Sequence, residues 1–387
     1  MKIGIITHFW VANFGANLQA LSTFMYLKKQ GYNPVMLNYK PLELENSTVN
    51  SVTPQQYEFH KDVVDTYLNT SPVLRDDNDL IDYCNKEKFD LIIAGSDSIL
   101  RVKKNVATED GRFPNSFWMQ WVDQLDIKPP RAFLAASTEG SYYPLLSREI
   151  KKGIHEAISN TNYVSVRDRW SKSMVKYITK GNINPNICPD PVSVLNEVFE
   201  IPKEFGQQSE SIKGKYVLIS TSTKYFSPSW VAELKKILNN DGKKLISLPT
   251  PGREFEFNVD HSIKLPLHPF EWYQWIKNAS GIITSQFHPI ACSIFNSVPF
   301  ISIDISGKMY FRLFGIRQTS KAYDICCNVN AANNSYLPMQ ARLLLSPTKT
   351  VNLLSQIDNS AINQYQIESR NKYSEIIDNI ICLAKNN

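Results

Sequence analysis

The sequence predicts an α/β protein made of two domains with mostly parallel sheets. Short apolar runs alternate with segments of helical spacing along most of the chain, which is typical of strands connected by helices. A stretch rich in proline and charge, residues 189–215, interrupts this alternation and indicates a linker. The length of 387 residues also fits two domains. Two such domains facing each other would leave a cleft between them, a frequent place for a ligand.

The first series of elements precedes the linker. Its expected strands span residues 2–7, 33–39, 89–94, 131–136 and 163–166. Apolar residues at helical spacing predict helices over residues 16–30, 80–88 and 147–160, and Gly31 is a stop signal for the first of them. Residues 45–75 are polar and irregular, so we expect only a short helical segment there.

The second series begins after the linker. Its expected strands span residues 216–220, 244–248, 281–284 and 298–303, and its expected helices span residues 230–239, 269–278 and 290–295. Residues 351–384 again have helical spacing. We therefore divide the chain into an N-terminal domain over residues 1–195, a C-terminal domain over residues 196–350 and a terminal helix over residues 351–387.

Composition indicates an ordinary globular protein. Hydrophobic residues make up 43% of the chain and charged residues 20%. A net charge of +5 is too small to indicate nucleic-acid binding, although it permits attraction to acidic substrates or an anionic membrane surface. No apolar run approaches the roughly 18 residues of a membrane-spanning helix, and the first residues do not resemble a signal peptide. The six cysteines form no CxxC pair, so we expect no metal site and a soluble cytoplasmic protein.

The turn after the first strand is a candidate ligand site. Asn13 can cap the following helix, Gly15 lets a ligand approach the backbone, and Asn17 lies in the first helical turn. The free N–H groups at a helix start favour phosphate or carboxylate groups. These residues could equally shape the turn and pack on the sheet, and the motif is neither GxGxxG nor a P-loop.

Polar residues also follow two other strands of the first domain. Ser96 and Asp97 end the strand over residues 89–94, and Ser137 ends the strand over residues 131–136. Each alone could be a helix cap or part of a turn. Because parallel strands bring their carboxyl ends to one edge of the sheet, these two strand ends and the turn after the first strand together favour a shared ligand crevice.

The strongest single candidate is His288, placed between a strand and a helix of the second domain. An imidazole titrates near neutral pH and can donate or accept a proton. A helix start would lower its pKa and a bound anion would raise it, whereas the alternative is a histidine held by backbone near Ser285. Arg167 follows the strand over residues 163–166 and could hold a carboxylate or phosphate, or could pair with Asp168 or Asp190. Lys224 could add positive charge to the cleft.

Six motifs in this order resemble the polysaccharide pyruvyl transferase family. They are NFGANLQA, DLIIAGSD, AFLAAS, VSVRD, PDPV and GIITSQFHPIACSIFNSVPFI, and the resemblance covers about residues 1–305. It implies a GT-B-like fold, with two Rossmann-like domains around a central cleft and a C-terminal helix that packs back on the first domain. The family activity is transfer of pyruvate from phosphoenolpyruvate to a sugar of a cell-surface polysaccharide, exopolysaccharide or related cell-envelope glycan, usually as a ketal.

The resemblance assigns roles to particular residues. The family histidine falls on His288, the expected general acid or base, and the arginine of the SVR motif falls on Arg167, a ligand for the donor. The family's turn falls on residues 13–16 and its GSD motif on residues 95–97. Together with the positions at strand ends and beside His288, the candidate donor- or substrate-binding residues are Asn13, Gly15, Asn17, Ser96, Asp97, Ser137, Ser285, Gln286 and Lys224. Phosphoenolpyruvate is then a co-substrate, and the resemblance implies neither a cofactor nor a metal.

The chain also departs from the family pattern. Gln286 stands where members with an RLH motif have arginine, Pro289 stands where glycine is usual, and residues 98–100 replace a common QVW. If that arginine binds the donor, another cation must replace it here.

Several alternatives stay open at this point. A GT-B glycosyltransferase using a nucleotide sugar would share the fold, and a binding protein that has lost the chemistry would keep the cleft. The acceptor sugar is not specified, and neither are a lipid-linked acceptor, contact with the inner face of the membrane or self-association. Trp10, Trp118 and Trp121 could stack on sugar rings or belong to the core.

Overall fold

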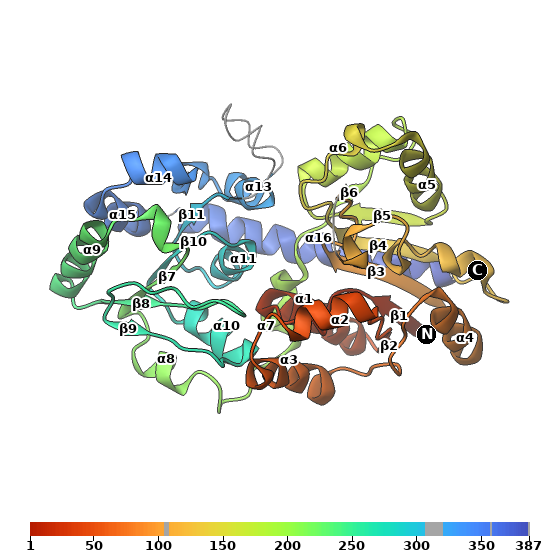
Figure 1. Ribbon diagram of the computed structural model, residues 1–387, viewed down its shortest axis with the longest axis horizontal. Helices are drawn as coiled ribbons and strands as arrows, with labels where there is room; N and C mark the ends of the chain where they lie inside the picture. Colours follow the sequence, from red (N-terminus) through yellow and green to blue (C-terminus); the bar gives the residue numbers. More distant parts are fainter. Residues whose placement is uncertain (104–107, 306–319, 357, 386–387) are drawn as a thin grey trace.

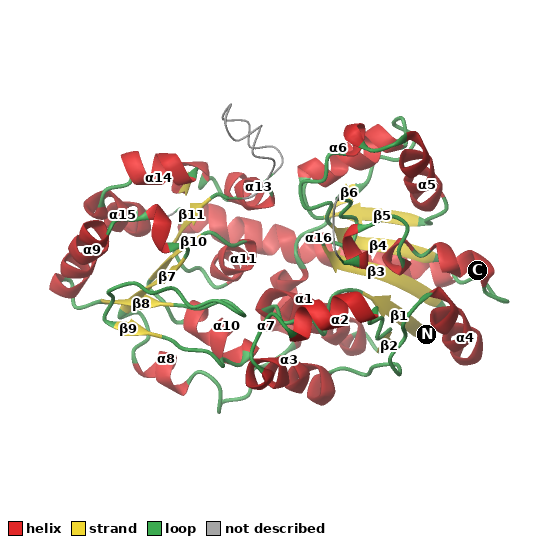
Figure 2. Cartoon of the chain, viewed as in Figure 1, coloured by secondary structure: helices red, strands yellow, loops and turns green. Residues whose placement is uncertain are grey.

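Two parallel six-stranded sheets, with helices packed around them, make up the molecule (Figures 1 and 2). The computed structural model describes residues 1–103, 108–305, 320–356 and 358–385. Every strand pair within the two sheets is parallel. The predicted α/β fold with two parallel sheets is therefore confirmed.

The N-terminal sheet has the strand order β2-β1-β3-β4-β5-β6. Its strands are β1 Lys2–Ile6, β2 Asn33–Met36, β3 Leu91–Asp97, β4 Arg131–Ala136, β5 Tyr163–Val166 and β6 Asn186–Ile187. The helices of this half are α1 Phe14–Lys29, α2 Leu42–Val49, α3 Pro54–Tyr67, α4 Asp77–Glu87, α5 Arg148–Ser159 and α6 Arg169–Ile178. In a parallel sheet all carboxyl ends lie at one edge, so the residues after β1, β3, β4 and β5 gather there.

The C-terminal sheet has the strand order β12-β11-β10-β7-β8-β9. Its strands are β7 Tyr216–Ser220, β8 Lys244–Ser247, β9 His261–Ser262, β10 Gly281–Thr284, β11 Phe300–Ile303 and β12 Ser335–Tyr336. Its helices are α8 Gln207–Ser211, α9 Pro228–Asn240, α10 Pro269–Lys277, α11 Phe287–Phe295, α13 Lys321–Asn328, α14 Pro338–Leu344 and α15 Pro347–Ser355. β10 lies between β7 and β11, which places the start of α11 at the centre of the sheet edge.

A short crossing segment and the last helix join the two halves. The crossing segment contains the 3₁₀ turn η5 Pro191–Val194 and the helix α7 Leu195–Val198, and α16 Asn359–Lys385 spans both halves (Figure 1). Tyr373 and Ser374 of α16 share hydrogen bonds with Thr23 (3.0 Å) and Tyr26 (2.8 Å) of α1. One apolar core continues from α1 through η5 and α16 to α10 and α11, so the two sheets share a buried boundary.

Two segments differ from the sequence-based expectation. The single terminal helix over residues 351–387 is two helices, α15 and α16. Residues 45–75 are more regular than predicted, because they contain most of α2 and all of α3. α3 buries Gln56 and His60 together with Val63 and Val64, and the two polar residues on its buried face hide the apolar spacing that identifies a helix.

In the described part of the chain, no helix combines the length and the apolar character needed to cross a bilayer.

Candidate active site

A cavity of about 530 Å³ lies where the two halves meet. The N-terminal half contributes the turn between β1 and α1, part of α2 and the residues that follow β3. The C-terminal half contributes the loop after β8, Trp272 of α10, the start of α11 and Lys321 of α13. The cavity therefore lies at the carboxyl ends of strands from both sheets, where the sequence predicted the cleft.

The turn between β1 and α1 brings the two halves into close contact. Asn13 caps α1, since its side-chain oxygen accepts a hydrogen bond from the backbone N–H of Ala16 (3.2 Å). Gly15 lies against the imidazole of His288, and a Cβ at this glycine would stand 2.0 Å from the ring. Both Asn13 and Gly15 line the cavity. Glycine is needed here for close approach of His288 rather than for an unusual backbone angle.

His288 is the second residue of α11 and lines the cavity. Ser285 and Gln286 immediately before it line the cavity too, and Gln286 provides no side-chain cap to the helix. Burial and, to a smaller extent, the charge of Arg167 lower the pKa of His288 to about 4, against the opposing effect of Asp190 and Asp97. The imidazole of the ligand-free protein is therefore neutral near pH 7.

Arg167 and Asp190 form a buried ion pair beside this histidine. The Nη1 of Arg167 donates hydrogen bonds to Asp190 Oδ2 (2.7 Å) and to Gln19 Oε1 (3.2 Å). The same Oδ2 lies 3.8 Å from Nε2 of His288. Asp190 also caps η5, because its Oδ1 accepts a hydrogen bond from the N–H of Val192 (3.1 Å). The pairing that the sequence left open for Arg167 is therefore with Asp190.

Asp97 extends the charged groups toward β1. Its Oδ1 lies 3.6 Å from Nη2 of Arg167, and its Oδ2 lies 3.9 Å from Nδ1 of His8. Burial alone would raise the pKa of Asp97, but the charge of Arg167, with smaller effects of His8 and other cations, holds it well below its ordinary value. Asp97 is thus ionised in the cavity wall.

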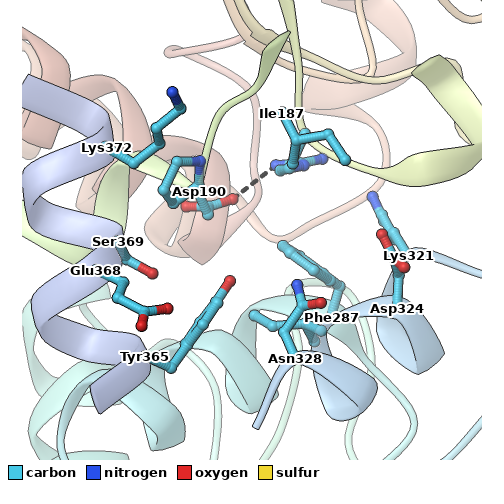
Figure 3. Close-up of a pocket in the computed structure, with 13 residues that line it drawn as sticks. Ile187, Asp190, Phe287, Lys321, Asp324, Asn328, Tyr365, Glu368, Ser369 and Lys372 are labelled. Atoms are coloured by element: carbon cyan, nitrogen blue, oxygen red, sulfur yellow. Dashed lines mark hydrogen bonds and ion pairs between the residues drawn. The ribbon is translucent and has the colours of Figure 1, made fainter. Parts of the chain in front are cut away.

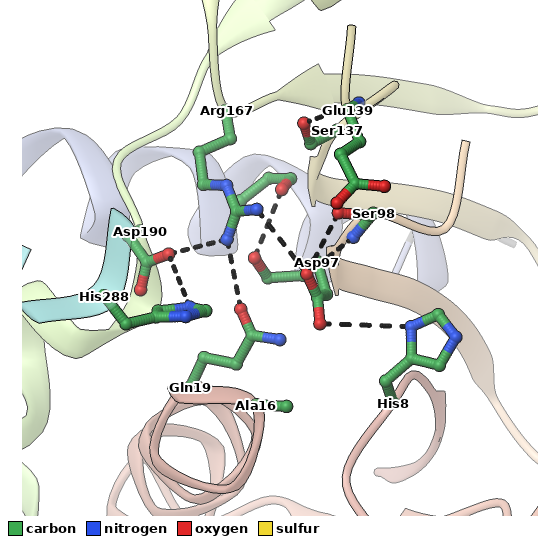
Figure 4. A network of polar contacts seen from close by, with 12 residues as sticks. His8, Ala16, Gln19, Asp97, Ser98, Ser137, Glu139, Arg167, Asp190 and His288 are labelled. Atoms are coloured by element: carbon green, nitrogen blue, oxygen red, sulfur yellow. Dashed lines mark hydrogen bonds and ion pairs between the residues drawn. The ribbon is translucent and has the colours of Figure 1, made fainter. Parts of the chain in front are cut away.

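These contacts make one continuous polar chain between histidines of the two halves (Figure 4). The chain runs from His8 through Asp97, Arg167 and Asp190 to His288. Sequence reasoning did not single out His8, although its position at the end of β1 was the signal that could have identified it. An arrangement with two histidines and fixed charges in one cavity can move protons and orient a polar substrate.

Lys321 is the other residue that sequence reasoning missed. It stands at the start of α13, and its ammonium lies 5.2 Å from the centre of the Phe287 ring, while the guanidinium of Arg167 lies 4.8 Å from it. Burial, followed by the charge of Arg167, lowers the pKa of Lys321, whereas Asp97 and Glu139 oppose the shift. No sequence motif marks this lysine, because α13 follows β11 only after a long intervening segment.

A smaller cavity of about 180 Å³ lies next to the first (Figure 3). Arg167 and Asp190 line it, and Phe287 and Lys321 line both cavities. Tyr365 and Glu368 of α16 close it from the other side. Arg167 therefore faces the smaller cavity, and it contacts Asp97, which lines the larger one.

Besides Arg167, four residues predicted for the site are not in the wall of the large cavity. Ser96 donates a hydrogen bond to the carbonyl of Ala135 (3.2 Å), and Ser137 donates one to Asp168 (2.8 Å). Asn17 donates to the carbonyl of Phe9 (2.8 Å) and faces His60. Lys224 is exposed, with its ammonium over the ring of Tyr225. The first three hold the strand ends and α1 in place.

The three tryptophans that could have stacked on a sugar are not in the cavity wall. Trp118 and Trp121 are completely buried and Trp10 is 3% exposed, so these three tryptophans belong to the core and are closed to a sugar. In the part of the chain that the structure describes, no group of three or more His, Cys, Asp or Glu side chains is arranged to hold a metal ion.

Comparison with known families places the chain in one of them. Residues 13–307 match the model of the polysaccharide pyruvyl transferase family. The chain belongs to this family. The matched segment begins at Asn13, the last residue of the β1–α1 turn, and includes the end of β3, Arg167, Asp190 and the start of α11. No curated protein gives a significant match to the full sequence.

Solved structures show that the fold is GT-B-like. A UDP-GlcNAc 2-epimerase from Neisseria meningitidis, bound to UDP-GlcNAc, aligns over 99% of this chain and 100% of its own, with a TM-score of 0.57 and 10% identity. The MnaA protein of S. aureus, solved with UDP, aligns over 98% of this chain and 97% of its own, with a TM-score of 0.54 and 11% identity. A UGT transferase from Siraitia grosvenorii in complex with UDP aligns over 98% of this chain and 99% of its own, with a TM-score of 0.51 and 10% identity. At such low identity these similarities establish the fold alone.

Proposed function

We propose that this polysaccharide pyruvyl transferase moves pyruvate from phosphoenolpyruvate onto a sugar of a cell-surface polysaccharide or its lipid-linked precursor. The product is a pyruvate ketal, and phosphate is released. The observation that carries the proposal is that His288 and Asp97, in the wall of the large cavity, both contact the buried Arg167–Asp190 pair, and all four residues lie within the segment that matches the family.

The reaction forms two C–O bonds at C2 of phosphoenolpyruvate. One acceptor hydroxyl adds to C2 while C3 takes up a proton and becomes a methyl group. A second hydroxyl of the same sugar then attacks C2, and the bond from C2 to the phosphate oxygen breaks. Of the two hydroxyl protons, one ends on C3 and one on the departing phosphate. Both steps need a positioned group that gives and takes protons, which contributes roughly 10²–10⁴-fold in rate.

His288 is the proposed general acid and base. With a pKa of about 4 its ring is neutral in the free protein, and the negative charge of bound phosphoenolpyruvate would raise that pKa, since an opposite charge favours the imidazolium. The charged ring would then protonate C3, and the neutral ring left behind would accept the proton of the second hydroxyl. Asp190, 3.8 Å from Nε2, would hold the ring in place through both steps.

The anionic groups of the donor need cations in the wall. Lys321 lines the cavity beside Phe287. We propose that its charge replaces that of the arginine which some family members have at the position of Gln286. The free N–H groups at the start of α11, which Gln286 does not cap, would add to this site. Arg167 would support it from behind Phe287.

The proposal also assigns a place to the protein. Growing glycans are commonly presented on lipid carriers, so we place the reaction in the cytoplasm, at the inner face of the membrane when the acceptor is lipid-linked. No cofactor beyond the co-substrate phosphoenolpyruvate is part of the proposed reaction.

The donor is tested by ligand-induced stabilisation and by phosphate release from the same preparation. We expect phosphoenolpyruvate to raise the melting temperature, since a ligand that binds only the folded state stabilises it, and to release phosphate only when an acceptor from a panel of β-galactosides and N-acetylhexosamines is present. Stabilisation by a nucleotide sugar, with no phosphate release from phosphoenolpyruvate, would instead assign the protein to nucleotide-sugar glycosyl transfer.

A further inference from the structure

The wall of the cavity at the His8 end of the polar chain carries buried polar groups that the proposed steps do not use (Figure 4). His8 is 6% exposed, and its ring packs against Phe117 at 4.6 Å between centroids. Its Nε2 lies 3.5 Å from Oδ2 of Asp110, and its Nδ1 lies 3.9 Å from Oδ2 of Asp97. Arg101 forms an ion pair with Asp110 on the other side. His8, Asp97, Asp110 and Arg101 all line the cavity, and we call them the His8 cluster.

Three atoms of the His8 cluster lack a hydrogen-bond partner within the protein. They are Nε2 of His8, Oδ1 of Asp110 and Nε of Arg101. Buried polar atoms in proteins are nearly always hydrogen-bonded, to protein, water or ligand. Unpartnered atoms in the wall of an open cavity therefore indicate a ligand that supplies the missing bonds.

The chemistry of the cluster selects the kind of ligand. Asp97 and Asp110 carry negative charge, and Glu139, which pairs with Arg101 at 2.9 Å, lines the same wall. Burial would raise the pKa of Asp110, but its contact and charge interaction with His8, together with the charge of Arg101, hold it well below its ordinary value. A phosphate would be repelled by three carboxylates here. Hydroxyl groups both donate and accept hydrogen bonds, so a polyhydroxylated sugar fits.

We propose that the His8 cluster binds the acceptor sugar and that His8 takes the proton of the hydroxyl that first attacks the donor. The inference rests on the proposed function and divides the cavity into a donor end at His288 and Lys321 and an acceptor end at the His8 cluster. Asp97 and Asp110 would stabilise the imidazolium that forms on His8, as a carboxylate does for a general-base histidine.

The proton transfers balance with this assignment. In the first step the hydroxyl proton passes to His8, the oxygen–C2 bond forms, and C3 receives a proton from His288. In the second step the other hydroxyl gives its proton to the now neutral His288, the second oxygen–C2 bond forms, and the C2–phosphate bond breaks. His8 then returns its proton to the departing phosphate, so both histidines end the reaction in the protonation states in which they began it.

The first test separates the two ends of the cavity by kinetics. His8→Gln keeps hydrogen-bonding capacity but cannot accept the proton, so we expect kcat to fall by roughly 10²-fold, the KM for the acceptor to rise, and the KM for phosphoenolpyruvate to change by less than about twofold. Asp110→Asn should raise the acceptor KM in the same way. The matched control is His155→Gln, because His155 lies on α5 away from the cavity and contacts the carbonyl of Ile178.

The inference is wrong if His8→Gln and Asp110→Asn both keep the kcat and acceptor KM of the unmodified protein. It is also wrong if their main effect is on the KM for phosphoenolpyruvate, because the cluster would then belong to the donor end.

A second test does not depend on turnover of phosphoenolpyruvate. Saturation-transfer NMR with methyl β-galactoside and methyl N-acetyl-β-glucosaminide should show contact of at least one sugar with the unmodified protein and with His155→Gln, and loss of that contact in Asp110→Asn. Sugar contact without phosphate release would reject the proposed donor while supporting the acceptor end. Sugar contact that is absent, or unchanged in Asp110→Asn, would overturn the inference.

Discussion

Gly15 shows how much of the active site depends on a single residue. The ring of His288, from the other half of the molecule, occupies the space where any larger residue at position 15 would place its Cβ. The glycine thus lets the start of α1 and the start of α11 approach each other, and it keeps His288 within reach of Asp190.

Gly15→Ala should therefore separate the two halves at this point. A Cβ 2.0 Å from the imidazole must displace the ring or the helix, and forced overpacking of this kind costs about 1–3 kcal/mol of stability. We expect a lower melting temperature and loss of most transferase activity. Ser22→Ala is the control, because Ser22 lies in the same helix and its hydroxyl only donates to the carbonyl of Leu18. Equal activity of the two variants would contradict this role.

At this scale the sequence predicts which strand ends matter better than which side chains face the ligand. Asp97 lines the cavity while its neighbour Ser96 turns into the protein, as successive residues of a strand point in opposite directions. His8 stands at the end of a predicted strand but was not singled out, because its contact with Asp110 depends on how the chain folds after β3. Lys321 could not be predicted because no local pattern fixes where α13 docks.

Among the elements, the junction of α1, α3 and α10 holds the two halves together with buried polar groups. Gln56 of α3 forms two hydrogen bonds with the backbone of Leu267 just before α10. Its Nε2 donates to the carbonyl of Leu267 (2.8 Å), and its Oε1 accepts from the N–H of Leu267 (2.7 Å). The ring of His60 lies between Asn17 Oδ1 (2.5 Å) and Gln56 Nε2 (3.0 Å). A neutral ring satisfies both partners, with Nδ1 donating to Asn17 and Nε2 accepting from Gln56. The sequence predicted only a short helical segment in this region, because these polar residues occupy the buried face of α3.

This junction predicts a loss of stability in acid. Burial, and then the neighbouring His268, lowers the pKa of His60 from 6.5 to about 3. Between these values the unfolded chain binds a proton that the folded protein does not, so the free energy of unfolding rises with pH in this window and falls on acidification. We expect denaturant unfolding at several pH values to show this slope, with His288 adding to it down to about pH 4. In His60→Gln the slope near pH 5 should shrink by about one proton; an unchanged slope would show that His60 does not titrate in this way.

At the scale of the whole molecule, the two parallel sheets follow from the alternation of apolar runs and helices. The sequence could not show how the halves are joined. A continuous apolar core and the crossing helix α16, whose residues Tyr373 and Ser374 bond to α1, hold the sheets together. Those contacts link residues about 350 positions apart, and local spacing carries no information about such distant pairs. The cavity exists only because of this arrangement.

The central claim is that this cavity transfers pyruvate from phosphoenolpyruvate with His288 as the acid and base. The most direct measurement is detection of the pyruvate ketal on the acceptor, by mass spectrometry and by the methyl signal in NMR, for the unmodified protein, His288→Gln and the control His155→Gln. We predict ketal formation by the unmodified protein and the control, with at least a roughly 10²-fold lower rate in His288→Gln and an unchanged fold by circular dichroism. Ketal formed by His288→Gln at the rate of the control would contradict the account.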